Sequence, residues 1–451
     1  MAPRSQALPP DVVAALAAGG GGGRAARHLA ALQERAHRML LLGVVREATA
    51  SGHPGAPATA RAFELLAGLE RRAPDAVRRV IRHPSAGAWA RAAYRQLRAG
   101  VSGGQAMRTR ESGPGRPRTR ENGHDPARGR DGGGHDPKRM GAVAAAAAAL
   151  ARFPCRVEVP APGGWADLPG LGRVRARGGG PEAVVRVGED GGLEVDGEPA
   201  VLEPLHGLVT EDGGLRLLVD DLDAYRWDPA RVPGGRLAAA ERERWGRCLD
   251  GAWRTLRSHH WTVAEECRAM LTVLTPIKGT DTAVDSACSP DHFGAIALSP
   301  PPDALWLAMT FAHELQHAKL GALADAVRLT LPDDRLYYAP WRHDPRPLPS
   351  LLQGAYAHLG VAGFWRRQRA FEPGLRPHVE FAHWRAATHT AIGTLLGSER
   401  LTDEGRRFVS AMRATVARWL AEPVPGEALE AGRAQAAAHR TRWRTQHGPD
   451  A

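Results

Sequence analysis

The sequence predicts an α+β protein that is helix-dominated, with N-terminal and C-terminal helices around a β-rich middle. Three observations support this fold class. Apolar residues recur at three- and four-residue steps over residues 27–100 and again from 351 to about 444, which is the period of an amphipathic helix. Between residues 153 and 226 the pattern changes to short alternating segments bounded by Gly or Pro, as expected of strands.

These changes in pattern divide the chain into five expected parts. They are an N-terminal helical part (1–100), an insertion rich in Arg, Gly and Pro (101–141), a β-rich middle that also contains helices (142–300), a catalytic part of metal-binding helices (301–421), and a frayed tail (422–451). In the middle part, a helical period returns over residues 238–274, and the run HFGAIALSP (292–300) has the character of a strand. The pattern does not support a parallel, doubly wound sheet.

The insertion has almost nothing to bury, so we expect it to be disordered. It contains the motif Gly-His-Asp-Pro twice, at residues 123–126 and 134–137. The two histidines of this repeat could bind a metal, but a solvated loop is the better explanation. We therefore expect the insertion to be dispensable for activity.

The charge of the chain does not indicate a nucleic-acid-binding protein. The formal net charge is +11, but nearly all the cations are arginines, and residues 108–139 alone hold nine Lys and Arg against five Asp and Glu. No basic stripe is interleaved with aromatic residues, and no zinc-finger or recognition-helix pattern occurs. An acidic peptide partner would account for the charge equally well.

Nothing in the sequence indicates a membrane or secreted protein. The longest apolar run, residues 142–151, is about half the length that a membrane-spanning helix needs. The N-terminus lacks the pattern of a signal peptide, so we expect it to be unprocessed. The four cysteines show no C-x-x-C spacing, and we expect a reducing, cytoplasmic location.

The segment FAHELQHAKLGAL (311–323) contains the motif H-E-x-x-H at His313, Glu314 and His317. The apolar period around it predicts a helix, on which residues four apart differ by about 40° and one turn, so both imidazoles can bind one metal ion. Glu314 lies about 100° from His313, at the edge of that face. From there Glu314 can reach a metal-bound water or orient a ligand.

A metal site needs a third ligand, and the usual metallopeptidase patterns do not supply one. The metzincin pattern would need Gly at position 320 and His at 323, where this chain has Leu320 and Leu323. A gluzincin would need a glutamate soon after the motif, but the next one is Glu372. His358, in the next predicted helix, is the better candidate, although a lone histidine on an apolar face is more often a core residue. Three imidazoles suit zinc and Fe(II) alike, so the metal stays open here.

The loop between these two predicted helices carries Arg342 and Arg346 among prolines and aromatic residues. Either arginine could hold the carboxylate of a cosubstrate by charge-assisted hydrogen bonds. Solvated arginines in a Pro-rich connector are the competing interpretation. Arg385 is a lower-ranked anchor, and His343 is a weaker candidate for a metal ligand than His358.

An ordered series of segments resembles the bacterial HExxH-motif domain proteins. The segments are HRMLLLGVVREA, APDAVRRVIRHPSAGAWA, LPGLG, LVDDLDAYR, SACSPDHFGAIALSPPPDALWLAMTFAHELQHAKLGAL, YYAPWRHDPRPLPSLLQGAYAHLGVAGFW and LTDEGRRFV, which span residues 35–410. Characterised members of that family are α-ketoglutarate-dependent peptide β-hydroxylases of RiPP clusters, which make ribosomally synthesised and modified peptides. Some members are fused to radical SAM enzymes.

The resemblance implies an Fe(II)/α-ketoglutarate-dependent dioxygenase that β-hydroxylates a precursor peptide, with His313 and His317 as iron ligands. It also implies a radical SAM enzyme of the same pathway as a partner. The third ligand, His358, is our inference onto the matching AYAHL segment. Glu314 would then orient a histidine or the cosubstrate. The alternatives are a zinc metallopeptidase in which Glu314 is the general base, and a non-catalytic metal-containing module that binds a peptide.

Overall fold

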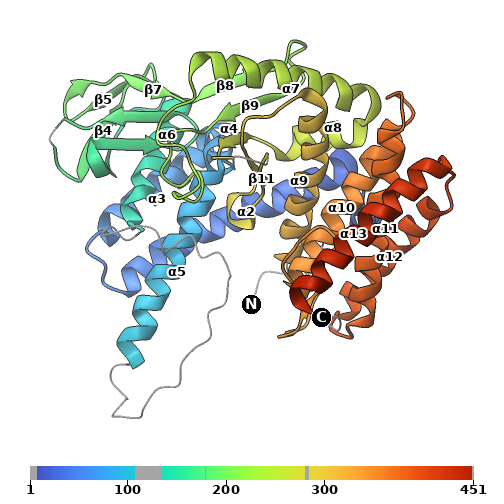
Figure 1. The fold of residues 1–451 in the computed structure, drawn as a ribbon. Coiled ribbons are helices and arrows are strands. Elements are labelled where there is room, and N and C mark those ends of the chain that lie inside the picture. The colour runs from blue at the N-terminus through green and yellow to red at the C-terminus, as the bar shows by residue number, and fades with distance from the viewer. Residues whose placement is uncertain (1–7, 107–134, 178, 280–283, 449–451) are drawn as a thin grey trace.

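The computed structural model describes residues 8–106, 135–177, 179–279 and 284–448 of the chain. Helices make up most of the described residues. Along the chain, one helical region precedes several small sheets and another follows them. Figure 1 places the small sheets on one side of the molecule and the C-terminal helices on the other. The predicted α+β, helix-dominated fold class is therefore confirmed. Among the described helices, none combines the length and apolar composition that a membrane-spanning helix requires.

The N-terminal part is helical, as predicted. Its helices are α1 (Pro10–Ala17), α2 (Gly22–Ala50), α3 (Ala56–Arg72), α4 (Pro74–Ile81) and α5 (Pro84–Ala106). Proline occupies the first or second position of α1, α3 and α4 and the first position of α5. Proline is favoured there because its missing N–H would have no partner within the helix. The boundaries between these helices thus follow directly from local sequence.

The predicted insertion is shorter than expected at its C-terminal end, and most of it (107–134) lies outside the described residues. Residues 135–141, which were assigned to the insertion, instead begin an ordered region. The Asp136 side chain accepts a hydrogen bond from the backbone N–H of Lys138 and caps η2 (Pro137–Arg139), which leads into α6 (Met140–Ala151). The second repeat histidine, His135, lies beside the ring of Tyr225, with the ring centroids 5.7 Å apart.

The alanine-rich run that follows forms α6, which lies against β1 (Cys155–Pro160). Residues Met140 to Ala148 are all buried. A side chain on Gly141 would place its Cβ 2.0 Å from the carbonyl oxygen of Glu158, so only glycine permits this contact. Small residues here allow the helix and the strand to pack closely.

The middle part contains small sheets, as predicted. One has the order β1-β4-β5-β6, with β4 (Glu182–Val187), β5 (Leu193–Val195) and β6 (Glu198–Pro199); a second has the order β2-β3-β7, with β2 (Trp165–Leu168), β3 (Gly172–Arg175) and β7 (Leu202–Pro204). A third has the order β11-β12-β10-β9-β8, with β8 (His206–Val209), β9 (Arg216–Val219), β10 (Val273–Pro276), β11 (Ser286–Ala287) and β12 (Ala295–Leu298). In the third sheet β10 runs parallel to both β9 and β12, an arrangement the sequence pattern did not indicate. The strands are so short that their sequences carry no sign of pairing direction.

A buried polar cluster joins the N-terminal helices to these sheets. The Arg139 guanidinium contacts the Asp223 carboxylate at 2.6 Å, and the Ser85 hydroxyl donates to the same carboxylate at 2.8 Å. Burial works to raise the pKa of Asp223, but the Arg139 charge and the hydrogen bonds from the Tyr225 backbone and Ser85 together outweigh it, and the pKa lies below its usual value. Asp223 of the LVDDLDAYR segment therefore has a structural role, because it ties together parts of the chain that are distant in sequence.

The C-terminal half is helical. Its helices are α7 (Ala239–His259), α8 (Trp261–Met270), α9 (Ala304–Ala324), α10 (Leu348–Gln368), α11 (Arg376–Gly397), α12 (Asp403–Leu420) and α13 (Gly426–His447), with a short hairpin of β13 (Leu336–Tyr337) and β14 (Arg346–Pro347) before α10. Helices α9 to α13 lie side by side (Figure 1), and α10 packs against both α9 and α11.

The prediction of a frayed tail over 422–451 is wrong for most of its length. Helix α13 packs along α11, with Trp443 only 1% exposed and Gly432 buried. A Cβ at Gly432 would lie 3.1 Å from the backbone nitrogen of His383, so the glycine permits the close approach of the two helices. The Ala- and Arg-rich composition concealed these contacts because they depend on small residues and one tryptophan.

We predict that His260, at the joint between α7 and α8, makes the fold sensitive to acid. Burial lowers the pKa of His260 to about 4, and its ring stacks on Phe364. Because the unfolded chain binds this proton near pH 6.5, the stability from neutral His260 is complete above pH 6.5 and is lost as the pH falls towards 4. Between pH 7 and pH 5 the loss is about 2 kcal/mol.

His260→Gln removes the titration and retains a donor towards Gln368, whose Oε1 lies 3.0 Å from His260 Nε2. Urea unfolding at both pH values should therefore show a smaller pH-dependent loss in His260→Gln than in the parent protein. An equal loss in the two proteins would contradict this assignment.

Candidate metal centre

The H-E-x-x-H motif lies in the middle of α9, as predicted. Asp303 caps this helix by accepting a hydrogen bond from the backbone N–H of Trp306 at 2.7 Å. The helical spacing places the imidazole rings of His313 and His317 on one side, with their centroids 4.9 Å apart. The spacing within α9 alone therefore places the two motif histidines next to each other.

Helix α10 brings the third predicted histidine to the same place. The His358 ring lies 5.1 Å from the His313 ring, centroid to centroid. The approach depends on Gly360, because a Cβ there would lie 2.6 Å from Gln316 Cγ and 2.7 Å from the carbonyl oxygen of Ala312. A larger residue would push α10 away from α9. The helix pair therefore gathers His313, His317 and His358 into one cluster, which we call the histidine cluster.

Hydrogen bonds fix the orientation of two of these rings. His358 Nδ1 lies 2.8 Å from the carbonyl oxygen of Gly354, and His317 Nδ1 lies 3.2 Å from Gln353 Oε1. Both partners are acceptors, so each Nδ1 carries the proton and each Nε2 keeps a free lone pair. This is the arrangement that metal-binding histidines usually adopt.

Tryptophans enclose His358 on both sides. The Trp341 ring stacks on it at 4.3 Å, and the Trp384 ring lies 4.6 Å away. Trp341 fits because residue 354 is glycine: a Cβ there would lie 2.5 Å from Trp341 Cζ2. The His358 ring is 8% exposed as a result, whereas the His313 side chain is 22% exposed. The cluster is thus closed on the His358 side and accessible to solvent on the His313 side.

Two histidines of the cluster, His313 and His358, are held neutral by their surroundings. Burial lowers the pKa of His313 well below its usual value, and His317 and His358 add to the shift. Burial likewise lowers the pKa of His358 to about 3. Neutral imidazoles with free Nε2 atoms are the form in which histidine binds a metal ion.

Glu314 lies at the edge of the cluster. Its Oε1 accepts a hydrogen bond from the Ser286 hydroxyl at 2.7 Å and lies 3.9 Å from His313 Nε2. Its Oε2 is buried and has no partner among the described residues. Burial and the adjacent Glu314 carboxylate raise the pKa of the Cys288 thiol, which keeps that thiol protonated. An unpaired buried carboxylate oxygen is costly, so Glu314 is set up to meet a further group.

Two of the three ring separations fit a shared metal ion. A ring centroid lies about 3.2 Å from a metal bound through Nε2, so two imidazoles at a tetrahedral or octahedral metal have centroids about 4.5 to 5.2 Å apart. The His313–His317 and His313–His358 distances of 4.9 and 5.1 Å agree with that range. Nevertheless, no group of three or more His, Cys, Asp or Glu side chains among the described residues is arranged to hold a metal ion as it stands. The ligand set of His313, His317 and His358 therefore stays a prediction.

The two predicted cosubstrate arginines share one carboxylate partner, Asp344. Arg342 Nε and Arg346 Nη1 contact opposite oxygens of Asp344, at 2.8 and 2.9 Å. Burial works to raise the pKa of Asp344, but these two bonds outweigh it and lower the pKa to about 2. Arg342 and Arg346 stay predicted anchors for a cosubstrate.

The weaker candidates are engaged elsewhere. The Arg385 guanidinium donates to the carbonyl oxygens of Trp419 and Glu422, at 2.6 and 2.9 Å, and so caps the end of α12. The His343 ring stacks on His439 of α13 with a centroid distance of 5.7 Å. These contacts give both residues a structural role.

Several residues around the cluster were not anticipated from the sequence. They are Gln353, Trp341, Trp384, Ser286 and Cys288. Gln353 could have been found, because it lies five residues before His358 on the same predicted helix. The contact of Ser286 with Glu314 had no sequence signal, since it depends on the pairing of β11 with β12.

Neither a scan against protein-family models nor a comparison with curated protein sequences finds a match to this chain.

We predict that Gln353 sets the metal affinity of the cluster. Gln353→Ala should weaken Co(II) binding about 10- to 100-fold, because His317 loses the acceptor that fixes its tautomer. The measurement is a titration followed by the visible absorption of bound Co(II). Arg367→Ala, an exposed change on the same helix, is the control and should bind as the parent does. Equal affinities for all three proteins would show that Gln353 does not orient a ligand.

Proposed function

We propose that this chain is an Fe(II)/α-ketoglutarate-dependent dioxygenase that hydroxylates the β-carbon of side chains in a ribosomally synthesised precursor peptide. The observation that carries the proposal is the packing of His313, His317 and His358 into one cluster, in which hydrogen bonds orient the rings of His317 and His358. Its chemical class comes from the resemblance to the HExxH-type peptide β-hydroxylases.

The three histidines would hold the metal through their Nε2 atoms. When bound, Fe(II) with α-ketoglutarate and oxygen supplies the oxidising power that replaces a C–H bond by C–OH, while α-ketoglutarate is converted to succinate and carbon dioxide. The protein's own residues position the metal-binding rings and shield them from water. Gln353 and Gly354 fix the rings, and the two tryptophans exclude water from the His358 side. The accessible side, at His313, is where cosubstrate and peptide would enter.

Glu314 has a positioning role in this proposal. One of its oxygens is held by Ser286, and the carboxylate lies beside the Nε2 of His313. A fixed carboxylate there orients a ligand or the cosubstrate without moving a proton. In the alternative, a zinc metallopeptidase, the unpartnered Oε2 would instead accept a proton from metal-bound water.

The arginine pair would anchor α-ketoglutarate. Asp344 bridges Arg342 and Arg346, and a dicarboxylate presents the same kind of oxygen pair. In this proposal a carboxylate of α-ketoglutarate competes with Asp344 for Arg346, the less exposed of the two, whose side chain is 35% exposed.

We place this activity in the cytoplasm, with a radical SAM enzyme of the same pathway as partner. All four cysteines, Cys155, Cys248, Cys267 and Cys288, are free thiols, which fits a reducing compartment.

The first test is an anaerobic titration of metal-free protein with Fe(II) and then α-ketoglutarate. We expect a visible charge-transfer band that requires both additions. His358→Ala should abolish the band, because one of three ligands is missing, whereas His343→Ala should retain it. Stoichiometric zinc binding without such a band would favour the metallopeptidase, and the absence of stoichiometric metal would favour a non-catalytic module.

The second test separates the two kinds of metal chemistry. Glu314→Gln keeps the size of the side chain and removes the carboxylate. An oxygenase in which Glu314 only positions a group should retain measurable α-ketoglutarate turnover, with a loss of about 10- to 100-fold. Ser286→Ala, which removes the partner of Oε1, should show a smaller loss in the same succinate assay. Complete loss of turnover in Glu314→Gln would instead indicate that the carboxylate transfers a proton.

A further inference from the structure

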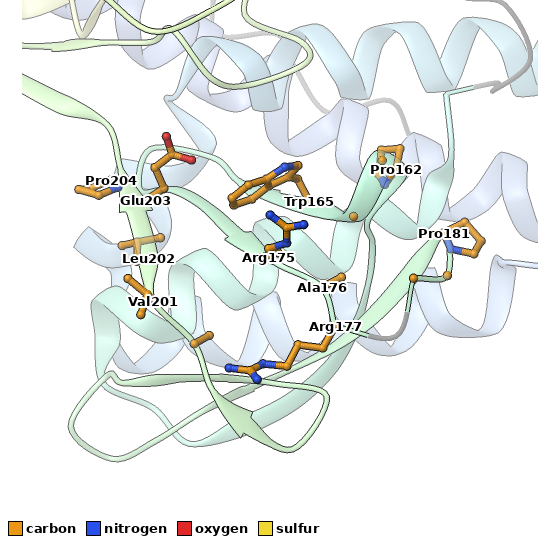
Figure 2. Close-up of a pocket in the computed structure, with 15 residues that line it drawn as sticks. Pro162, Trp165, Arg175, Ala176, Arg177, Pro181, Val201, Leu202, Glu203 and Pro204 are labelled. Atoms are coloured by element: carbon orange, nitrogen blue, oxygen red, sulfur yellow. The ribbon is translucent and has the colours of Figure 1, made fainter. Parts of the chain in front are cut away.

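A second site lies on the small sheet β2-β3-β7, away from the histidine cluster. A pocket of 1340 Å³ opens there, between the sheet and the turn that follows β3. Figure 2 shows Trp165, Arg175, Val201 and Glu203 on its walls, with Arg177 reaching across below them. These residues come from elements that do not contribute to the histidine cluster.

Strand register explains why these side chains share one face. Trp165 pairs with Arg175, and Arg173 pairs with Glu203, so all four point to the same side of the antiparallel sheet. The other side carries buried residues and packs on the core; among them are Ala166, Leu168 and Val174. Val201, two residues before Glu203, is 89% exposed. An aromatic ring, an exposed valine and several arginines thus lie on an uncovered sheet face.

The charges on this face are not balanced. Arg173 pairs with Glu203 at 2.7 Å and lies over the Trp165 ring at 4.2 Å. Arg175 and Arg177 are exposed, and neither makes an ion pair with a carboxylate among the described residues. The pocket therefore offers two free guanidinium groups beside apolar surface.

The two arginines suit a peptide with more than one acidic side chain. Arg175 is the last residue of β3, and Arg177 lies in the bend that follows, so the two guanidinium groups line different parts of the pocket. Separate acidic side chains of a bound segment would each meet one arginine. Its apolar side chains would contact Trp165 and Val201.

We propose that this pocket binds an acidic, extended segment of a peptide. The inference rests on the proposed function in one respect: it assigns the segment to the peptide that is hydroxylated. Docking at the sheet would then hold the peptide while a distant side chain enters the histidine cluster. The tether raises the local concentration of that side chain without any demand on the sequence around it.

A nucleic acid fits the pocket less well. One tryptophan provides little stacking surface for successive bases. A peptide with both acidic and apolar side chains uses every feature of this face.

The test is fluorescence anisotropy with a fluorescein-labelled peptide of alternating Glu and Val, using metal-free full-length protein. The double variant Arg175→Glu/Arg177→Glu should bind about tenfold more weakly, as expected for the loss of two partly exposed charge-assisted contacts. Arg216→Glu reverses an exposed arginine on β9, outside the pocket, and should change binding less than about twofold. If charge reversal disturbs folding, the double variant Arg175→Gln/Arg177→Gln replaces it, because it removes both charges without adding new ones. A control peptide with Gln in place of Glu should bind weakly to every protein.

Three outcomes would overturn the proposal. These are equal losses in the pocket and Arg216 variants, equal binding of the Glu and Gln peptides, and tighter pocket-dependent binding of a single-stranded oligonucleotide. Because binding is measured without metal, it is independent of the iron and α-ketoglutarate titration. Peptide binding without the charge-transfer band would leave the pocket standing and remove the dioxygenase; the band without peptide binding would do the reverse.

Discussion

The close contact of α9 with α10 is the constraint on which the candidate site depends. Gly360 faces the Ala312 carbonyl and Gln316 at distances that exclude any Cβ. That contact fixes the height of α10 along α9, and His358, two residues away, consequently lies beside His313. Gly354, one turn before His358, admits Trp341 and offers its carbonyl oxygen to the His358 ring. Two glycines thus determine both where the third imidazole lies and how it is oriented.

Buried polar contacts also fix the face of α9 that carries Gln316 and Lys319. Lys319 forms an ion pair with Glu266 at 2.8 Å, and its ammonium group also donates to the carbonyl oxygen of Gly20. Gln316 donates to the carbonyl oxygen of Gly19 in the same N-terminal loop. A buried lysine without these acceptors would be strongly destabilising, so the loop and α8 hold α9 in one position. The helix that carries the motif is therefore held by α10, α8 and the N-terminal loop together, and its histidines form a preorganised cluster.

Catalysis and peptide recognition, as we propose them, use different kinds of structure. The histidine cluster sits between packed helices, where burial keeps the imidazoles of His313 and His358 neutral. The proposed peptide pocket sits on an open sheet face, where arginines stay charged and hydrated until a partner arrives. Because the two sites are separate, the positive charge of the pocket does not repel a metal cation from the histidine cluster. The pocket would select the peptide by its charge, and the cluster would select the side chain that can reach it.

The sequence by itself determined the helix-dominated fold class, the position of most helices and the pairing of His313 with His317. Each of these follows from local periodicity or from spacing within one helix. The resemblance and the search for a third ligand pointed to His358, but only tertiary structure decided that this ring lies beside the other two. Tertiary structure also decided the parallel strands, the docking of α13 and the shared face of Trp165, Arg175 and Glu203. Contacts between distant segments depend on glycine clearances and strand register, and neither leaves a periodic signal in the sequence.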